Sequence, residues 1–150
     1  MPKAPHSPSA DAALRVLYLG VENPGYPRNA RIRAFLEERF AADITVVEID
    51  TNPGVVRKAR ALLRAGRRYP RGTFDVVVLA ELQNKQAWIA RYLAWRHRAV
   101  LVVDWFVGLY ETRVGDWRLV RPASPKARLW HAMDSFAARS ADLALIDTDA

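Results

Sequence analysis

Short apolar runs alternate with amphipathic stretches along most of the chain, and this alternation is the strongest structural signal that it carries. The apolar runs are rich in Val, Leu and Ile and cover residues 14–20, 44–49, 74–80, 99–103 and 142–146. Unbroken runs of this kind are typical of strands buried on both faces of a parallel sheet. We therefore predict an α/β fold, a Rossmann-like doubly wound parallel sheet of about five buried strands in a three-layer αβα arrangement.

The amphipathic stretches predict four helices. Asn29 can cap a helix over residues 30–40, and Asn52 with Pro53 can begin a second helix that Gly66 ends at about residue 65. A third helix is predicted over residues 83–95, and Ser124 before Pro125 marks the start of a fourth. The helical spacing predicts three inward faces, formed by Ile32, Phe35, Leu36 and Phe40, by Trp88, Ile89, Tyr92 and Leu93, and by Leu129, Met133, Phe136 and Ala137.

Length and composition indicate one globular domain. The chain has 150 residues, of which 51% are hydrophobic and 26% charged, and it has no Cys, which excludes disulfides and thiolate chemistry. Residues 1–13 are polar and rich in Pro, so we expect a flexible N-terminal tail before a domain over residues 14–150. No apolar run approaches the roughly 18 residues of a membrane-spanning helix, and the N-terminus has no secretory-signal pattern. We therefore expect a cytoplasmic location.

Positive charge is concentrated in one segment. The formal net charge is +7, and residues 51–74 supply all of it, since they hold seven basic residues and no acidic one. A single basic segment predicts one anionic partner, either an anionic membrane at its inner face or another polyanion. No nucleic-acid motif accompanies it, so no nucleic acid is expected. The predicted anion-binding residues, here called the basic strip, are Arg57, Arg60, Arg64, Arg67, Arg68 and Arg71.

Two long connections point to a site at one edge of the sheet. Residues 21–29 and 104–123 both follow predicted strands, and the carboxyl ends of parallel strands are where open α/β sheets bind ligands. Acidic residues recur at these ends, and Asp104 is the best candidate general base because it ends a buried strand and opens the longest loop. Arg28 is placed to bind an anionic group. The recurring acidic residues are Glu22, Asp50, Glu81, Asp104 and Asp147.

The sequence lacks the motifs of several common nucleotide and metal sites. The first strand is followed by Gly20-Val21-Glu22-Asn23-Pro24-Gly25 rather than by a Gly-rich dinucleotide fingerprint, and the chain has no Walker A pattern. No two His residues have metal-ligand spacing, so we expect neither a metal nor a cofactor. The loop over residues 104–123 is instead rich in aromatic residues, which stack on sugar rings and on lipid chains.

Three segments resemble the N-terminal domain of the GT-B retaining glycosyltransferases of family four. They are Tyr26-Pro27-Arg28-Asn29-Ala30-Arg31-Ile32-Arg33 after the first strand, Val102-Val103-Asp104-Trp105-Phe106-Val107-Gly108-Leu109-Tyr110-Glu111-Thr112 after the fourth, and Ser140-Ala141-Asp142-Leu143-Ala144-Leu145-Ile146-Asp147-Thr148 at the end. The resemblance covers residue 14 to the C-terminus, and the order and spacing of the segments carry it.

The resemblance implies an acceptor-binding domain that works with a second, nucleotide-sugar-binding domain. That second domain is not in these 150 residues, so the donor is expected to bind only through a missing or separate domain. The acceptor would be lipid-linked or a glycan. The residues implied to line the acceptor cleft are Glu22, Arg28, Asn29, Asp104, Tyr110 and Asp147.

Two other functions remain open from the sequence. The chain can be a non-catalytic α/β module that docks on an anionic membrane or polyanion through the basic strip. It can also be a flavodoxin-like nucleotide-binding domain, although the missing phosphate-binding loop speaks against it.

Overall fold

The computed structural model describes residues 12–146 and shows one five-stranded, all-parallel sheet. The strand order is β2-β1-β3-β4-β5, which confirms the predicted α/β fold. Residues 1–11 of the predicted tail lie outside the described residues. The strands are β1 (Arg15–Val21), β2 (Asp43–Glu48), β3 (Val76–Leu79), β4 (Val100–Trp105) and β5 (Leu143–Ile146).

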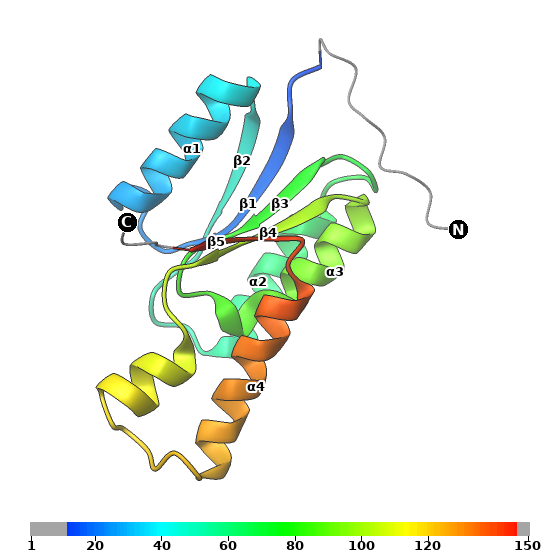
Figure 1. Ribbon diagram of the computed structural model, residues 1–150. Helices are drawn as coiled ribbons and strands as arrows, with labels where there is room; N and C mark the ends of the chain where they lie inside the picture. The colour runs from blue at the N-terminus through cyan, green and yellow to red at the C-terminus, as the bar shows by residue number, and fades with distance from the viewer. Residues whose placement is uncertain (1–11, 147–150) are drawn as a thin grey trace.

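Helices cover both faces of the sheet and complete the three layers. Figure 1 shows α1 on one face, with α2, α3 and α4 on the other. Two short helical segments, η1 and η2, lie in the connections that follow β3 and β4. No helix of the described residues is long and apolar enough to cross a membrane. The helices are α1 (Pro27–Phe40), α2 (Val55–Arg67), η1 (Asn84–Gln86), α3 (Ala87–His97), η2 (Glu111–Asp116) and α4 (Pro125–Ser140).

Successive side chains of the strands point to opposite faces, and this alternation builds two cores. On the face of α2, α3 and α4, Leu17 and Leu19 of β1 pack with Leu62 and Leu93 of the helices, all fully buried. On the opposite face, Tyr18 and its neighbours pack under α1. Full burial of one Leu side chain contributes about 1.5–3 kcal/mol, so the larger core supplies most of the stability of the sheet.

The fifth strand is an exposed edge rather than a buried strand, which corrects the prediction of five buried strands. Leu143 is 54% exposed and Ile146 is 60% exposed. Among the described residues, only β4 pairs with β5, and Figure 1 shows α1 lying over β1 and β2 rather than over β5. The start of the strand is fixed by Asp142, whose Oδ2 accepts the backbone N–H of Leu101 at 2.8 Å.

Three of the predicted helix ends are wrong. Asn52 does not cap α2, because α2 begins at Val55 with Gly54 as its N-cap. Asn29 is not the cap of α1, because α1 begins two residues earlier at Pro27 and the Asn29 side chain is buried under the helix. Gly66 does not end α2 but lies inside it, where a Cβ would come within 2.6 Å of both Leu93 methyl carbons. Glycine at this position therefore allows α2 and α3 to approach closely. The predicted cap of α4 is confirmed, since Ser124 Oγ accepts the N–H of Ala127 at 3.1 Å.

The inward faces of three helices differ in part from the prediction. In α1, Ile32 and Leu36 pack on the sheet while Phe35 and Phe40 contact each other outside it. In α3 and α4, Ile89, Leu93 and Ala137 are buried as predicted, and most of the other buried positions are held by alanine. The exposed large residues on these two helices are Trp88, Trp95, Leu129 and Phe136, whereas Ala87, Ala90, Ala94, Ala127 and Ala137 are buried.

Candidate functional site

The strand order 2-1-3-4-5 places the topological switch point of the sheet at the carboxyl ends of β1 and β3. β1 and β3 are neighbours in the sheet. The chain continues from β1 into α1 on one face of the sheet, and from β3 through η1 into α3 on the other face. Such a reversal is where doubly wound sheets bind ligands. In this structure the start of α1 and the ends of β3 and β4 bring polar side chains together at that place.

Arg28 and Asp104 form a buried ion pair across this edge. Arg28 Nε lies 2.8 and 3.0 Å from the two carboxylate oxygens of Asp104, and Arg28 Nη2 lies 2.6 Å from Oδ1. The Asp104 side chain has no solvent exposure and that of Arg28 is 17% exposed. The two residues that sequence analysis placed in separate loops therefore meet, with 76 residues of chain between them.

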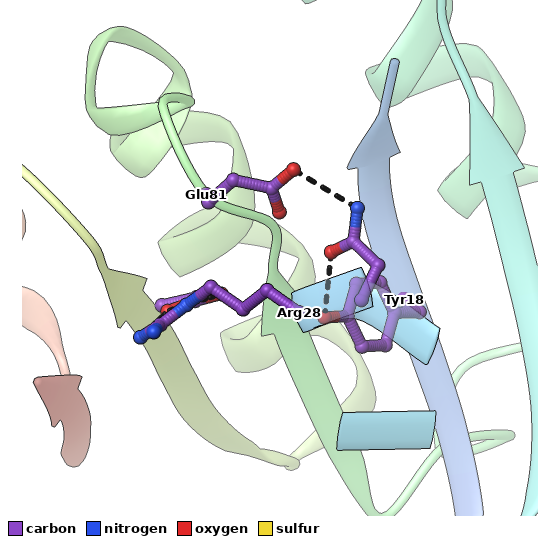
Figure 2. Close-up of polar contacts among 5 residues, drawn as sticks. Tyr18, Arg28 and Glu81 are labelled. Atoms are coloured by element: carbon purple, nitrogen blue, oxygen red, sulfur yellow. Dashed lines mark hydrogen bonds and ion pairs between the residues drawn. The ribbon is translucent and has the colours of Figure 1, made fainter. Parts of the chain in front are cut away.

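A chain of hydrogen bonds runs beside this pair, from Tyr18 through Asn29 to Glu81. The Tyr18 hydroxyl donates to Asn29 Oδ1 at 3.1 Å, and Asn29 Nδ2 donates to Glu81 Oε1 at 2.9 Å. Figure 2 shows Tyr18 of β1 and Glu81, after β3, at the two ends of this chain, with the Arg28 side chain extending away from both toward β4. Asn29, predicted as a helix cap and as an acceptor-binding residue, is the central member of this chain.

Glu81 has one carboxylate oxygen that is buried and has no hydrogen-bond partner within residues 12–146. The residue is 9% exposed, and burial raises the pKa of its carboxyl above the ordinary value, with a smaller contribution from the negative charge of Asp104. Burial likewise raises the pKa of Tyr18 above its ordinary value. A buried polar atom without a partner is costly, which points to a ligand group that supplies one.

The backbone beside Glu81 is strained. Leu82 has a φ of 62°, in the left-handed region that a residue with a Cβ rarely adopts, and its side chain is 54% exposed. Strain of this kind costs of order 1–3 kcal/mol and concentrates at binding sites. Leu82 lies in the turn between the end of β3 and η1, directly after Glu81.

An open, mostly apolar groove of about 550 Å³ adjoins the ion pair. Tyr26, Arg31 and Phe106 line it together with Leu145 and Ile146 of the exposed edge strand. The Arg28 guanidinium lies 5.1 Å from the centre of the Phe106 ring, so its cation is held between an aromatic face and a carboxylate. An aromatic face beside polar groups is suited to a ring that carries hydroxyls.

The other residues predicted to bind an acceptor lie elsewhere or outside the described chain. Glu22 accepts hydrogen bonds from Lys58 and from Gln83 Nε2, so it is paired on the opposite side of β1. Tyr110 packs edge-on against the ring of His131, and its backbone N–H donates to Asp134 Oδ2 at 2.8 Å. Asp147 lies outside the described residues.

Neither Tyr18 nor Glu81 is among the residues predicted to form the site. Glu81 is one of the carboxylates at the strand ends, so its position indicated that it lies at this edge of the sheet. Nothing in the sequence indicated that Asn29 would bind it. Tyr18 has the spacing of an ordinary core residue, and only the contact with Asn29 sets it apart.

The six arginines of the basic strip are exposed on α2 and in the turn after it. Within residues 12–146 none of the six forms an ion pair with a carboxylate. The described residues also contain no group of three His, Asp or Glu side chains arranged to hold a metal ion.

We compared the chain with protein-family models, with curated protein sequences and with solved structures, and none of the three comparisons found a match. Any function must therefore be argued from the residues of this chain and their geometry.

Proposed function

We propose that this chain is the acceptor-binding half of a glycosyltransferase. In this proposal the crevice formed by α1, β3 and β4 binds a lipid-linked or glycan acceptor, and a separate or additional domain holds the nucleotide-sugar donor. The observation that carries the proposal is the buried carboxylate oxygen of Glu81 that has no partner within the described residues, next to the Arg28–Asp104 pair.

Each of these groups has a part in binding a sugar. A hydroxyl of the acceptor can donate to the second oxygen of Glu81, whose first oxygen is fixed by Asn29. Because burial raises the pKa of Glu81, its carboxyl is suited to take up the proton that the hydroxyl loses on transfer. Phe106 offers an aromatic face beside Arg28 for the sugar ring.

The catalytic role predicted for Asp104 stays a prediction, and Glu81 is the better candidate for it. Both oxygens of Asp104 accept hydrogen bonds from Arg28, and its side chain has no exposure. Its function in this proposal is to hold the Arg28 guanidinium in place at the edge of the groove.

Binding of simple glycosides tests the proposal. The methyl glycosides of glucose, galactose, mannose and N-acetylglucosamine are titrated into ¹⁵N-labelled protein, with amide shifts followed by NMR. We expect at least one glycoside to shift the amides of Arg28, Asn29 and Glu81 and to lose this effect in Glu81→Gln. Glu37→Gln is the matched control, because Glu37 is an exposed carboxylate on α1 that lines neither the crevice nor the groove. Absence of shifts with all four glycosides would argue against a sugar site.

A second function, docking on an anionic membrane, is favoured by the six exposed arginines of the basic strip. Each basic residue near an anionic bilayer contributes about 1 kcal/mol, so six suffice for peripheral binding at the inner face of the membrane. This docking would bring the acceptor crevice to lipid-linked substrates.

Co-sedimentation with vesicles tests whether the basic strip binds a membrane or is only exposed to solvent. The triple variant Arg60→Glu, Arg64→Glu, Arg67→Glu is expected to lose binding to vesicles that contain phosphatidylglycerol. The control is the triple variant Arg121→Glu, Arg128→Glu, Arg139→Glu, which makes the same change in net charge at exposed positions before and along α4. Equal loss in both triple variants would show that only the net charge matters.

A further inference from the structure

A second cavity, of about 610 Å³, lies at the amino edge of the sheet, opposite the acceptor crevice. One wall is the turn before β3, which contributes Arg71 and Gly72, and the other is the end of α3 with the two residues that lead into β4. Figure 1 shows these two connections side by side at this edge. Sites for small ligands have volumes of about 300–1,000 Å³, so this cavity, here called the arginine cavity, can hold one.

The lining of the arginine cavity is strongly positive. None of the described residues that line it is acidic. Arg91 is paired with Asp142 at 3.3 Å, and Asp75, which also lies at this edge, binds Arg15 through both oxygens. Within residues 12–146 the other three arginines of the lining form no ion pair with a carboxylate, so three positive charges are uncompensated. The four arginines of the lining are Arg71, Arg91, Arg96 and Arg98.

One of these arginines has a buried donor without an acceptor. Arg96 Nη2 donates to the carbonyl oxygen of Tyr69 at 3.4 Å, whereas Arg96 Nε is buried and has no hydrogen-bond partner within residues 12–146. A buried donor of a charged group that lacks an acceptor is costly. Because Arg96 lines the cavity, an oxygen atom of a bound ligand can supply that acceptor.

The helix ends beside the cavity do not neutralise its charge. α2 and α3 both end at this edge of the sheet, and the last carbonyl groups of α3 accept the N–H groups of Arg98 and Ala99, at 3.2 and 2.8 Å. A helix dipole places about half a negative charge at the carboxyl end of its helix. The two dipoles together therefore offset about one of the three uncompensated cations and leave the cavity positive.

Packing beneath the cavity fixes its two walls. The rings of Tyr69, Phe74 and His97 are stacked edge to face, with centres 5.0 and 5.1 Å apart, and the last two are buried. This stack joins the turn before β3 to the end of α3. Small residues, among them Gly72 and Ala94, line the space between the arginines and leave it open.

An exposed aromatic ring also lines the cavity. Trp95 is 62% exposed, and the centre of its ring lies 6.0 Å from that of Tyr92. Arginines bind phosphate groups through pairs of N–H donors, and an exposed indole ring stacks on the flat ring of a base. A nucleotide has both groups. A phospholipid headgroup lacks the flat ring, and a nucleic-acid strand is typically bound by several aromatic side chains rather than by one.

We infer that the arginine cavity binds a free nucleoside diphosphate or triphosphate, with its phosphate groups on the arginines and its base on Trp95. All bases have a flat π face, so this arrangement selects for charge and ring rather than for one base. The inference goes beyond the proposed function, because the cavity and the acceptor crevice lie at opposite edges of the sheet. The cavity shares Arg71 with the basic strip, and the variants that test membrane docking leave Arg71 unchanged.

Titration with the diphosphates of adenosine, guanosine, cytidine and uridine tests the site. The chain has five Trp, so ¹⁵N spectra contain few indole N–H signals, and Trp95→Phe identifies that of Trp95. We expect at least one nucleoside diphosphate to shift this signal. It should bind about fivefold or more tighter than inorganic pyrophosphate, which has no ring to stack.

Two substitutions with matched controls show whether the cavity is the site. Arg98→Met removes an exposed and unpaired charge and should weaken binding of the nucleoside diphosphate by about tenfold. Its control is Arg39→Met, an exposed cation in the last turn of α1, with an expected change of less than about twofold. Trp95→Ala should weaken nucleotide binding by about fivefold or more and leave pyrophosphate binding unchanged. Its control is Trp88→Ala, an exposed Trp of α3 that does not line the cavity.

Several results would overturn the inference. They are binding of none of the four nucleoside diphosphates, binding no tighter than that of pyrophosphate, and binding that Arg98→Met or Trp95→Ala leaves unchanged. Tighter binding of a single-stranded oligonucleotide than of any nucleoside diphosphate would overturn it in favour of a nucleic acid. Loss of nucleotide binding in Glu81→Gln would place the nucleotide in the acceptor crevice instead. Glycoside binding is measured separately, so the proposed function and this site can fail independently.

Discussion

Replacing Arg28 with Met removes the guanidinium from a carboxylate that has no exposure to solvent. Asp104 would then remain as a buried charge without the three short contacts that Arg28 now provides. Removing one member of a buried ion pair costs about 3–5 kcal/mol, because the other charge loses its compensation. We expect Arg28→Met to lower the free energy of unfolding by that amount.

The effect of Asp104→Asn on the free energy of unfolding should have opposite signs with Arg and with Met at position 28. In the wild-type background it replaces a charge-assisted hydrogen bond and should destabilise by about 1–3 kcal/mol, since the Arg28 side chain keeps some access to water. In the Arg28→Met background the same change removes the uncompensated buried charge. It should therefore stabilise that variant by about 1 kcal/mol or more.

Urea unfolding of the four proteins, followed by circular dichroism and tryptophan fluorescence, measures this cycle. The slope of the unfolding free energy against urea concentration should be the same in all four proteins, so that differences in the urea midpoint measure differences in stability. The reasoning is refuted if Asp104→Asn destabilises both backgrounds equally, because the two side chains would then contribute independently.

Three further predictions concern the fold. Burial lowers the pKa of His97, so below about pH 6.5 the unfolded chain binds more protons than the folded protein does. Stability should therefore fall as the pH is lowered from about 7.5 to about 5. The fall in urea midpoint should be smaller for His97→Gln. Gly66→Ala should destabilise by about 1–2 kcal/mol in urea unfolding despite its better helix propensity, because the new methyl group meets Leu93. Ser124→Ala removes the hydrogen bond to Ala127 and should cost about 1 kcal/mol, measured as a fall in thermal midpoint.

The layers of this fold could be predicted from sequence because the strands of a parallel sheet are apolar on both faces. The same argument failed for β5, whose Leu143 and Ile146 have the composition of a buried strand but lie at the edge. Nothing local distinguishes a central from an edge strand of this composition, since the difference depends on which elements pack over it. The faces of α3 and α4 were predicted in part. Ile89, Leu93 and Ala137 are buried as expected, whereas Trp88, Leu129 and Phe136 were expected inside because they are large and apolar and are exposed.

The site could be predicted in part. Arg28 and Asp104 were expected at one edge of the sheet because both follow the carboxyl ends of strands, and the structure brings them into contact. Asn29 was interpreted as a cap because Asn is common at that position, and the tertiary contacts with Tyr18 and Glu81 override this local preference. The partners of a buried amide depend on the packing of α1 against the sheet, which a single sequence does not contain.

Within residues 12–146 nothing pairs with the outer edge of β5, and this has a consequence for solution experiments on the protein. Its four residues carry neither a charge nor a Pro, and such an edge invites the addition of another strand. Two molecules that join through β5 form a closed two-fold dimer, whereas β5 of one molecule on β2 of the next leaves free ends and grows into a fibre. Titrations are therefore best performed with dilute protein, and a charged residue in place of Ile146 is a simple way to keep the molecules apart.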